Sequence, residues 1–271
     1  MSAPTPTGTP GTEEVGHASP VAAARPRASN ALLVVLGLVV VLVMVAGYVV
    51  INRTGPAQRQ QNQQGQQAGS QLRASGLPST VPTSLAYLMG LSTLPAKAAP
   101  GFTLTDQAGK TVSLASLRGH AVVLEFMDPN CTDICPIVSQ EFIDAYKDLG
   151  VAASHVVFIA VNVNPFHVDV ASMATYSREH QLNSLPSWHF LTGPVSALQS
   201  VWHDYGVAVS APNATADVVH TSVAYFIDPS GVERFVAFPM VDHTSAGTAY
   251  YPAGPLAEWG HGIALVTRSL S

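Results

Sequence analysis

The sequence predicts an α/β domain in its C-terminal part, preceded by one membrane-spanning helix and a flexible linker. Beyond residue 96, short apolar segments of strand length alternate with amphipathic stretches of helix length. Residues 31–51 form one uninterrupted apolar run. A Gln-rich segment with no apolar periodicity separates this run from the domain. Together these three observations predict one folded domain with N-terminal appendages.

The apolar run Ala31–Ile51 contains no charged or strongly polar side chain over twenty-one residues. A helix of this length extends about 31 Å, which matches a hydrocarbon core of about 30 Å. The competing interpretation is a buried core helix, but such helices rarely run so far without a polar position. A cleaved signal peptide is disfavoured, because its apolar part is shorter and an Ala-x-Ala-like site should follow it. We therefore expect an uncleaved anchor in the lipid bilayer.

The anchor predicts a single-pass protein of the cell membrane. Two Arg residues precede the span, Arg25 and Arg27, and two follow it, Arg53 and Arg59, so the positive-inside count is tied. The long domain follows the first apolar segment, which is how a signal anchor exports the chain after it. We expect residues 1–30 to be a disordered cytoplasmic tail and the C-terminal domain to be extracytoplasmic.

Residues 52–95 are predicted to be a Gln/Pro/Ser-rich flexible linker. Eight of the fourteen residues from Gln58 to Gln71 are Gln, and a Ser-, Pro- and Ala-rich stretch follows to about Pro95. A flexible coil of this length has an end-to-end reach of about 35–40 Å. We expect a domain at 96–271 that can search the membrane surface from this tether.

The predicted elements of the domain follow one another as strands and helices. A hairpin is expected around the Gly109-Lys110 turn, and a second one around the turn at residues 228–231. A helix should begin near Cys135 and Pro136 and end at Gly150. The expected strands are 102–105, 111–114, 121–126, 155–163, 188–191, 222–227 and 233–238, and the expected helices are 135–149, 168–182, 194–205 and 256–270. This order predicts a sheet with crossover connections, closed by an antiparallel hairpin.

Charge excludes one class of function. Residues 1–94 hold five Arg and two Glu, a net charge of +3, and residues 95–271 hold seven Lys and Arg against fifteen Asp and Glu, a net charge of −8. The two sums give the −5 of the whole chain. A mildly acidic domain without a basic run is unsuited to nucleic acid, since phosphate contacts need clustered Lys and Arg.

The two cysteines of the chain, Cys131 and Cys135, carry its most specific signal. They follow a buried strand, are four residues apart, and open the expected helix, so both sulfurs should meet at one face of a helical turn. The positive end of a helix favours thiolate over thiol, and thiolates serve both soft-metal binding and disulfide exchange. A structural disulfide is a weaker interpretation, because so short a loop constrains the unfolded chain little. Zinc is disfavoured, because structural zinc sites use four Cys or His ligands.

The pattern as a whole resembles the SCO/SenC family. A strand precedes Cys-x-x-x-Cys-Pro at a helix start, and a distant His stands before a strand and an Asp-Pro-x-Gly turn. Residues 102–110, 188–193 and 220–231 carry the rest of the likeness. The resemblance implies a thioredoxin-like fold with an added β-hairpin. It also implies a membrane-tethered copper protein that serves cytochrome c oxidase assembly.

The resemblance implies the metal ligands Cys131, Cys135 and His220. Two thiolates and one imidazole suit Cu(I), and the imidazole also allows Cu(II). The expected function is that of a metallochaperone, with the copper-site subunit of cytochrome c oxidase and a copper donor protein as partners. His203 and His243 are reserve ligands, while an isolated His is usually a surface or satisfied polar residue.

Other functions use the same cysteines. As a thiol–disulfide oxidoreductase acting on the cysteines of an oxidase copper site, the chain would use Cys131 and Cys135 catalytically, without His220. A peroxidase and a pure scaffold are weaker alternatives, and the scaffold leaves the cysteines unexplained. The residues alone do not decide whether the chain is an enzyme, but the Cys-x-x-x-Cys spacing favours metal, since dithiol enzymes of this fold usually use Cys-x-x-Cys.

The sequence departs from the SCO/SenC pattern near the expected site. Val219 precedes His220 where many relatives carry Asp, and Asn164 replaces a more usual Asp before Pro165. Residues 128–130, Asp-Pro-Asn, replace a commoner aromatic-Thr pattern before the first cysteine. These departures concern metal affinity and partner choice more than the fold. The role of residues 240–255 is not predicted.

Overall fold

The computed structural model describes residues 76–245 and 249–270. Their centre is a six-stranded sheet with the strand order β1-β10-β9-β4-β5-β6. Strands β4 (Ala121–Met127), β5 (Val156–Asn162) and β6 (Trp188–Leu191) are parallel to one another. Strands β9 (Ala224–Ile227), β10 (Val232–Ala237) and β1 (Ser92–Ala98) complete the sheet in antiparallel fashion. The predicted α/β fold with crossover connections and a closing hairpin is confirmed.

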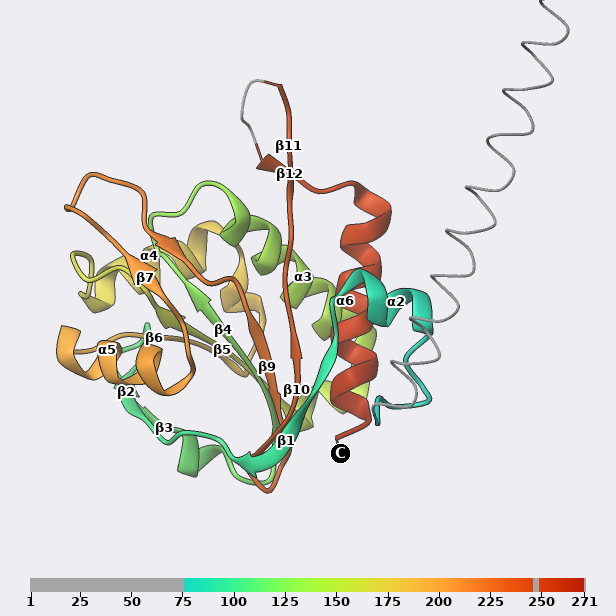
Figure 1. Ribbon diagram of the computed structural model, residues 1–271. Coiled ribbons are helices and arrows are strands. Elements are labelled where there is room, and N and C mark those ends of the chain that lie inside the picture. Colours follow the sequence, from blue (N-terminus) through green and yellow to red (C-terminus); the bar gives the residue numbers. More distant parts are fainter. Residues whose placement is uncertain (1–75, 246–248, 271) are drawn as a thin grey trace, which may run out of the picture. The chain divides into compact units, whose positions relative to one another are not determined.

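Helices and a hairpin cover the two faces of this sheet. One apolar core lies beneath α2 (Thr83–Leu88), α3 (Ile134–Leu149), α4 (Val170–Glu179) and α6 (Ala253–Arg268). A second core lies beneath α5 (Val195–Asp204) and the hairpin of β2 (Thr103–Thr105) and β3 (Thr111–Ser113). Figure 1 shows α3 and α6 on one side of the sheet and α5 with β2 and β3 on the other. All seven residues of both β4 and β5 are buried, as parallel strands covered on both faces require. The predicted elements beyond residue 96 lie within three residues of the observed ones.

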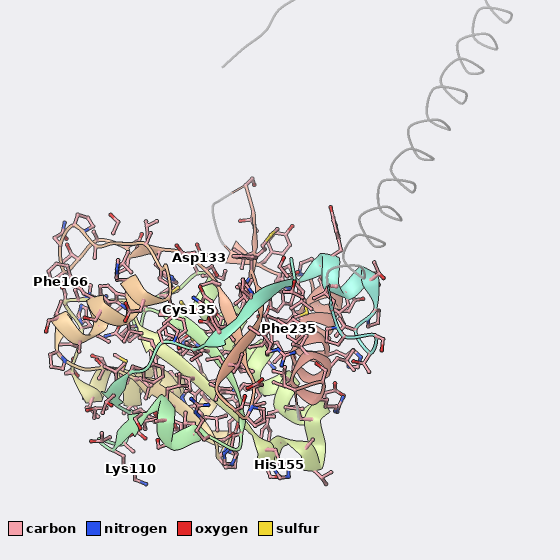
Figure 2. The ribbon with its side chains drawn as sticks, turned by 60° about the horizontal axis from the view of Figure 1, so that its bottom comes forward. Lys110, Asp133, Cys135, His155, Phe166 and Phe235 are labelled. Carbon is pink, nitrogen blue, oxygen red and sulfur yellow. The ribbon has the colours of Figure 1, made fainter. Side chains whose placement is uncertain are left out.

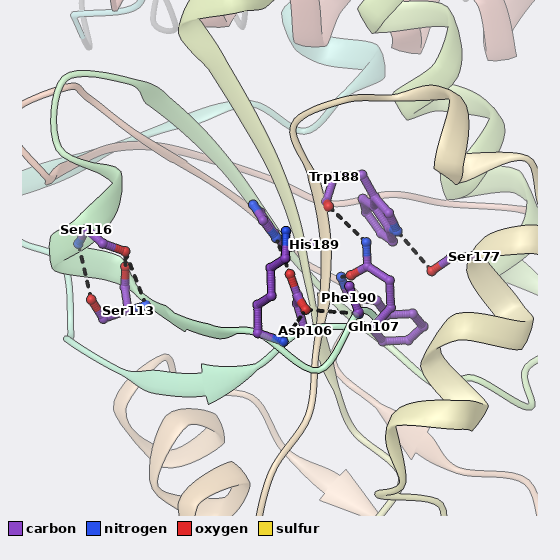
Figure 3. Close-up of polar contacts among 10 residues, drawn as sticks. Asp106, Gln107, Ser113, Ser116, Ser177, Trp188, His189 and Phe190 are labelled. Carbon is purple, nitrogen blue, oxygen red and sulfur yellow. Dashed lines mark hydrogen bonds and ion pairs between the residues drawn. The ribbon is translucent and has the colours of Figure 1, made fainter.

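The β2–β3 hairpin protects the exposed edge of β6. The Gln107 side chain donates from Nε2 to the carbonyl of Trp188 at 3.1 Å and accepts at Oε1 from the Phe190 N–H at 2.8 Å. Asp106 Oδ2 lies 3.1 Å from Nδ1 of His189 (Figure 3). One amide side chain thus satisfies the donor and the acceptor that an edge strand leaves unpaired.

The linker predicted for residues 52–95 is wrong for its last twenty residues. Residues 76–95 contain α2 and most of β1, and their apolar side chains are buried in the core: Val81, Leu85, Ala86, Met89 and Leu91. Pro95 made this segment resemble a tether. It is tolerated because β1 is an edge strand whose pairing with β10 is irregular between Thr93 and Lys97. The folded domain therefore begins before residue 96.

The remaining predictions for the N-terminal part concern residues that the structure does not describe. The tail at 1–30, the membrane helix at 31–51 and the linker at 52–75 lie outside the described residues. Among the described residues, no helix combines the length and apolar character needed to cross a membrane. Short strand pairs complete the domain: β7 (Val209–Ser210) with β8 (Val219–His220), and β11 (Asp242–His243) with β12 (Ala249–Tyr250).

Close packing of α6 on α3 supports the helix that carries Cys135. A Cβ atom added at Gly260 of α6 would lie 2.8 Å from the Asp144 Cβ and 3.2 Å from both the Ala145 nitrogen and the Glu141 carbonyl oxygen. Two of these atoms are α3 backbone and cannot move aside alone. The absence of a side chain at position 260 sets the distance between the helices.

We predict that Gly260→Ala lowers the free energy of unfolding by about 1–3 kcal/mol, because the new methyl group overpacks against the α3 backbone. Gly254→Ala, in the first turn of α6 with open space around it, is the matched control. It should raise stability by roughly 0.5–1 kcal/mol through helix propensity. Urea unfolding followed by tryptophan fluorescence measures both changes. Equal stabilisation by the two substitutions would contradict the packing argument.

Two buried carboxyl groups lie between β4 and its covering helix α3. Glu125 is 2% exposed and Glu141 is fully buried. Glu125 Oε1 and both Glu141 carboxyl oxygens have no hydrogen-bond partner among the described residues. Burial raises the pKa of Glu125 to about 8. Burial, and then the charge of Glu125, raise the pKa of Glu141 well above its usual range. Both groups are therefore held neutral at pH 7.

The folded state binds these protons more tightly than the unfolded chain does, so stability should fall as pH rises from about 4.5 towards 8. We predict that Glu125→Gln, which mimics the neutral acid, reduces the loss of unfolding free energy between pH 5 and pH 8 by roughly 2–4 kcal/mol. Urea unfolding at pH 5 and at pH 8 measures this loss for the wild-type chain and for the variant. Glu258→Gln, at an exposed position of α6, should leave the loss unchanged. An unaltered loss in the Glu125 variant would show that Glu125 is ionised in the folded protein.

Candidate dithiol and imidazole site

The topology of the sheet brings three loops to one edge. Strand β5 is parallel to β4, with Met127 opposite Asn162, so the two chains leave the sheet side by side. Strand β9 is antiparallel to β4, with Leu124 opposite Tyr225. The chain that enters β9 therefore lies at the edge where β4 ends. The cysteine loop, the loop after β5 and the segment before β9 meet there.

The cysteine pair lies where the chain turns from β4 into α3. Helix α3 begins at Ile134, so Cys131 precedes the helix. The spacing of the cysteines predicts instead that both lie in one helical turn. The Cys131 sulfur still reaches the first turn and accepts the N–H of Cys135 at 3.4 Å. Cys135 is 1% exposed and Cys131 is half-buried, and neither is in a disulfide. Figure 2 shows Cys135 and Asp133 well separated from Lys110 and His155, which lie at the lower edge of the view.

The two sulfurs differ in acidity because one donates a hydrogen bond to the other. The hydrogen bond from the Cys135 thiol lowers the pKa of Cys131 to about 7, and backbone N–H groups of the helix start add to this effect. The same hydrogen bond, together with burial, raises the pKa of Cys135 well above its usual range. Near neutral pH, Cys131 is thus the accessible thiolate and Cys135 the buried thiol.

His220 lies at the end of β8, opposite Val209 of β7, and is half-buried. Its Nδ1 lies 3.0 Å from the carbonyl oxygen of Thr221. A carbonyl only accepts, so Nδ1 carries the hydrogen and Nε2 keeps its lone pair. Burial lowers the pKa of His220, which favours the neutral ring. This is the tautomer and charge state that a metal-binding imidazole needs.

Cys131 and His220 line the same pocket, whose volume is about 1010 Å³. Cys135 is buried behind Cys131 and does not line the pocket. Among the described side chains, no group of three or more His, Cys, Asp and Glu is arranged to hold a metal ion. The structure thus brings the predicted ligands to one region without assembling them into a closed coordination group. Their donor atoms, two sulfurs and one imidazole nitrogen, fit a soft metal such as copper.

The other sequence candidates contribute less. His203 is exposed on α5 and does not line the pocket. The side chain of His243 lies outside the described part of the chain.

Sequence reasoning missed Asp128, Asn164 and His167 as pocket residues. The first follows β4 directly, and the other two lie in the loop after β5. The signal was available, because the carboxyl ends of adjacent parallel strands meet at one edge of a sheet.

The fold and the site together define a thioredoxin-like domain with a dithiol at the start of a helix and an imidazole across the pocket. The sequence matches the SCO1/SenC family model over residues 92–246, more than half of the chain. The chain therefore belongs to the SCO1/SenC family.

Two of three known relatives with similar sequences carry SCO names, and the third is a peroxiredoxin. The SCO1 protein homolog of Bacillus subtilis (strain 168) is 30% identical over 132 residues, which are 48% of this chain and 68% of that protein. The mitochondrial protein SCO2 homolog of Homo sapiens is 29% identical over 139 residues, and only 50% of its length is matched. The chloroplastic peroxiredoxin Q of Triticum aestivum is 35% identical over 137 residues, 51% of this chain and 55% of that protein.

The solved structure of one SCO protein shows the same fold. The apo Sco1 protein from Thermus thermophilus covers 66% of this chain and 94% of its own, with 23% identity and a TM-score of 0.50. ScoI of Bradyrhizobium japonicum was solved with copper bound; it covers 63% of this chain and 99% of its own, at 23% identity and a TM-score of 0.47.

We predict that iodoacetamide modifies Cys131 alone in the folded protein, with a pH midpoint of about 7. Cys135 should react only after unfolding, because it is buried. Cys135→Ala should move the midpoint upward, because it removes the hydrogen bond to the thiolate. Thr132→Ala, an exposed neighbour in the same loop, should not move it. Mass spectrometry of samples quenched at successive times measures the alkylation rate of each cysteine. Equal rates for the two thiols would contradict the proposed asymmetry.

Proposed function

We propose that this chain is a membrane-tethered copper-binding protein that delivers copper during cytochrome c oxidase assembly. The observation that carries the proposal is the shared pocket of Cys131 and His220, with Cys135 hydrogen-bonded to Cys131 at the helix start. Family membership supports the same reading. In this proposal the membrane anchor is residues 31–51, and the domain lies outside the cytoplasm.

Each residue has a separate task at the site. Cys131 supplies a thiolate at the pocket wall, and Cys135 supplies the second sulfur once its proton leaves. The Thr221 carbonyl holds the His220 ring with Nε2 available to copper. Binding of one ion by all three groups requires the His220 ring and the two sulfurs to come closer together, because the described side chains form no closed group of three ligands.

An open site suits a carrier, which must release its cargo as well as bind it. Val219, next to the proposed ligand His220, is 70% exposed at the pocket rim. It offers an apolar contact to a docking partner, which would be the copper donor or the copper-site subunit of the oxidase.

A thiol–disulfide oxidoreductase acting on the cysteines of an oxidase copper site is the second candidate. A specific observation favours it: an accessible thiolate stands beside a buried thiol, the arrangement that attacks and then resolves a mixed disulfide. This reaction needs Cys131 and Cys135 but gives no task to His220.

We predict that the reduced full-length chain, purified in nonionic detergent, binds about one Cu(I) in competition with a chromogenic chelator. Replacing both cysteines with Ser should abolish binding. His220→Ala should weaken it by roughly tenfold or more, since even the loss of a partner behind a ligand typically costs that much. His203→Ala, exposed on α5, should change nothing.

The same variants separate the two candidates. If His220→Ala retains its copper affinity while reduction of a disulfide substrate depends on the cysteine pair, the carrier proposal fails and the oxidoreductase remains. If His220→Ala loses copper and keeps reductase activity, the imidazole serves the metal alone.

A further inference from the structure

An uncharged face is formed by α2, the start of α6 and the extension that leads from β10 to β11. It is built from residues 76–96, 235–241 and 249–257, and none of these residues is Asp, Glu, Lys or Arg. Figure 1 shows α2 against α6, and the chain running nearly straight from β10 to β11. The seven basic and fifteen acidic residues of 95–271 therefore all lie outside these three segments.

Direct contacts join the segments into one surface. The Phe238 N–H donates to the carbonyl of Met89 at 3.0 Å. A Cβ atom added at Gly90 would lie 3.4 Å from the Phe238 ring, so this ring packs on the backbone that follows α2. The Gly90 N–H donates in turn to the Tyr87 carbonyl at 3.1 Å. Strand β12 pairs with β11 and so returns Tyr250 to the end of the same extension.

This uncharged face exposes large apolar side chains. Seven such side chains are exposed in the described part of the chain, and four of them belong to this face: Tyr87, Phe238, Met240 and Tyr250. Tyr87 is 72% exposed and Met240 is 63% exposed. Residues 238–240 are exposed, buried and exposed in turn, so Phe238 and Met240 share one side of the extended chain. An apolar cluster of this kind, free of charge, indicates an interaction surface.

The length of chain before the described domain indicates what this surface meets. The predicted span ends at residue 51 and the description begins at residue 76, so the 24 residues 52–75 separate them. A flexible coil of that length reaches about 25–30 Å. A domain of this size has a radius of gyration of about 16 Å, and hence a width of about 40 Å. The domain is therefore held within its own width of the bilayer.

We propose that the uncharged face rests on the lipid bilayer that holds the chain's own anchor. The inference rests on the proposed function in taking residues 31–51 as that anchor. Tyr and other aromatic side chains are favoured at the level of the lipid headgroups, whereas charged side chains are costly beneath it. The rest of the domain is acidic and is repelled by anionic headgroups, so the uncharged face can approach the lipid at the lowest cost.

This orientation leaves the candidate site open. The pocket that Cys131 and His220 line shares no residue with the uncharged face. A partner can therefore reach the pocket while the domain lies on the membrane. Lipid contact would limit the domain to one orientation, so that the pocket is presented to membrane-bound partners in a constant direction.

Quenching of tryptophan fluorescence by brominated lipid tests the contact. The full-length chain is placed in phosphatidylcholine vesicles whose acyl chains are brominated near the headgroup, and in unbrominated vesicles. The three native tryptophans, Trp188, Trp202 and Trp259, are buried in the domain and give a constant signal. The fluorescence added by Met240→Trp should be lost in brominated vesicles. Val151→Trp, at a position that is 96% exposed after the end of α3, is the matched control and should keep its fluorescence.

A charge placed in the face should release it. In a Tyr87→Trp chain, Met240→Asp should lower the ratio of docked to undocked domain roughly tenfold or more, because an apolar side chain no longer enters the lipid. Val151→Asp should leave the quenching of Tyr87→Trp unchanged. Salt at about 1 M, which screens charges to about 3 Å, should not release the domain either.

Three outcomes overturn the inference. The first is that Tyr87→Trp and Met240→Trp escape quenching. The second is that Val151→Trp is quenched equally, because the domain then meets the lipid without a preferred face. The third is a dimer in nonionic detergent that Met240→Asp dissociates, together with absent quenching, which assigns the face to a second copy of the chain.

Flotation and copper binding keep this inference separate from the proposed function. A chain that does not float with the vesicles overturns the anchor, and the docking of the face with it. A chain that floats without quenching keeps the anchor and loses the docking. If quenching follows the expected pattern while the wild-type chain binds no copper, the copper-carrier proposal fails and the docking stands.

Discussion

The site depends on the antiparallel placement of β9 beside β4. A wholly parallel sheet would put the chain entering β9 at the opposite edge from the end of β4. Because β9 runs against β4, with Val122 opposite Ile227 and Leu124 opposite Tyr225, the segment that carries His220 lies at the edge where the cysteine loop emerges. Strand β4 can hold this position because all seven of its residues are buried between two apolar cores. The site is thus built at the end of a strand that is buried along its whole length.

The start of α3 gives the two cysteines different exposure and different acidity. The Cys131 sulfur accepts the Cys135 N–H that a helix leaves unpaired in its first turn. Cys135, one turn further in, is buried beneath it. The helix can serve this purpose only if it stays in place, and its packing on α6 through Gly260 keeps it there. The reactivity of Cys131 at the pocket therefore depends on the packing of α3 against α6 in the core.

Much of this was predictable from sequence, for identifiable reasons. The strands beyond residue 96 and helix α3 follow from strong apolar periodicity and from the Cys-Pro helix start. The segment 76–95 was missed because α2 is only six residues long and Pro95 interrupts an edge strand, so local pattern was weak while tertiary burial was strong. Asp128 and Asn164 were noticed only as departures from a family pattern. Their hydrogen bond joins positions 36 residues apart, and such a contact depends on strand order rather than on local sequence.

A copper carrier and an oxidoreductase both need the cysteine pair in its reduced form. The cysteines alone therefore do not distinguish the two functions. A disulfide offers no thiolate to copper, and it cannot reduce another disulfide. His220 is different, because its lone pair faces a pocket where disulfide exchange has no use for it. The hydrogen bond from Nδ1 to the Thr221 carbonyl fixes the ring in the form that donates to a metal. Substitution of His220, rather than of Cys131 or Cys135, therefore distinguishes the two functions.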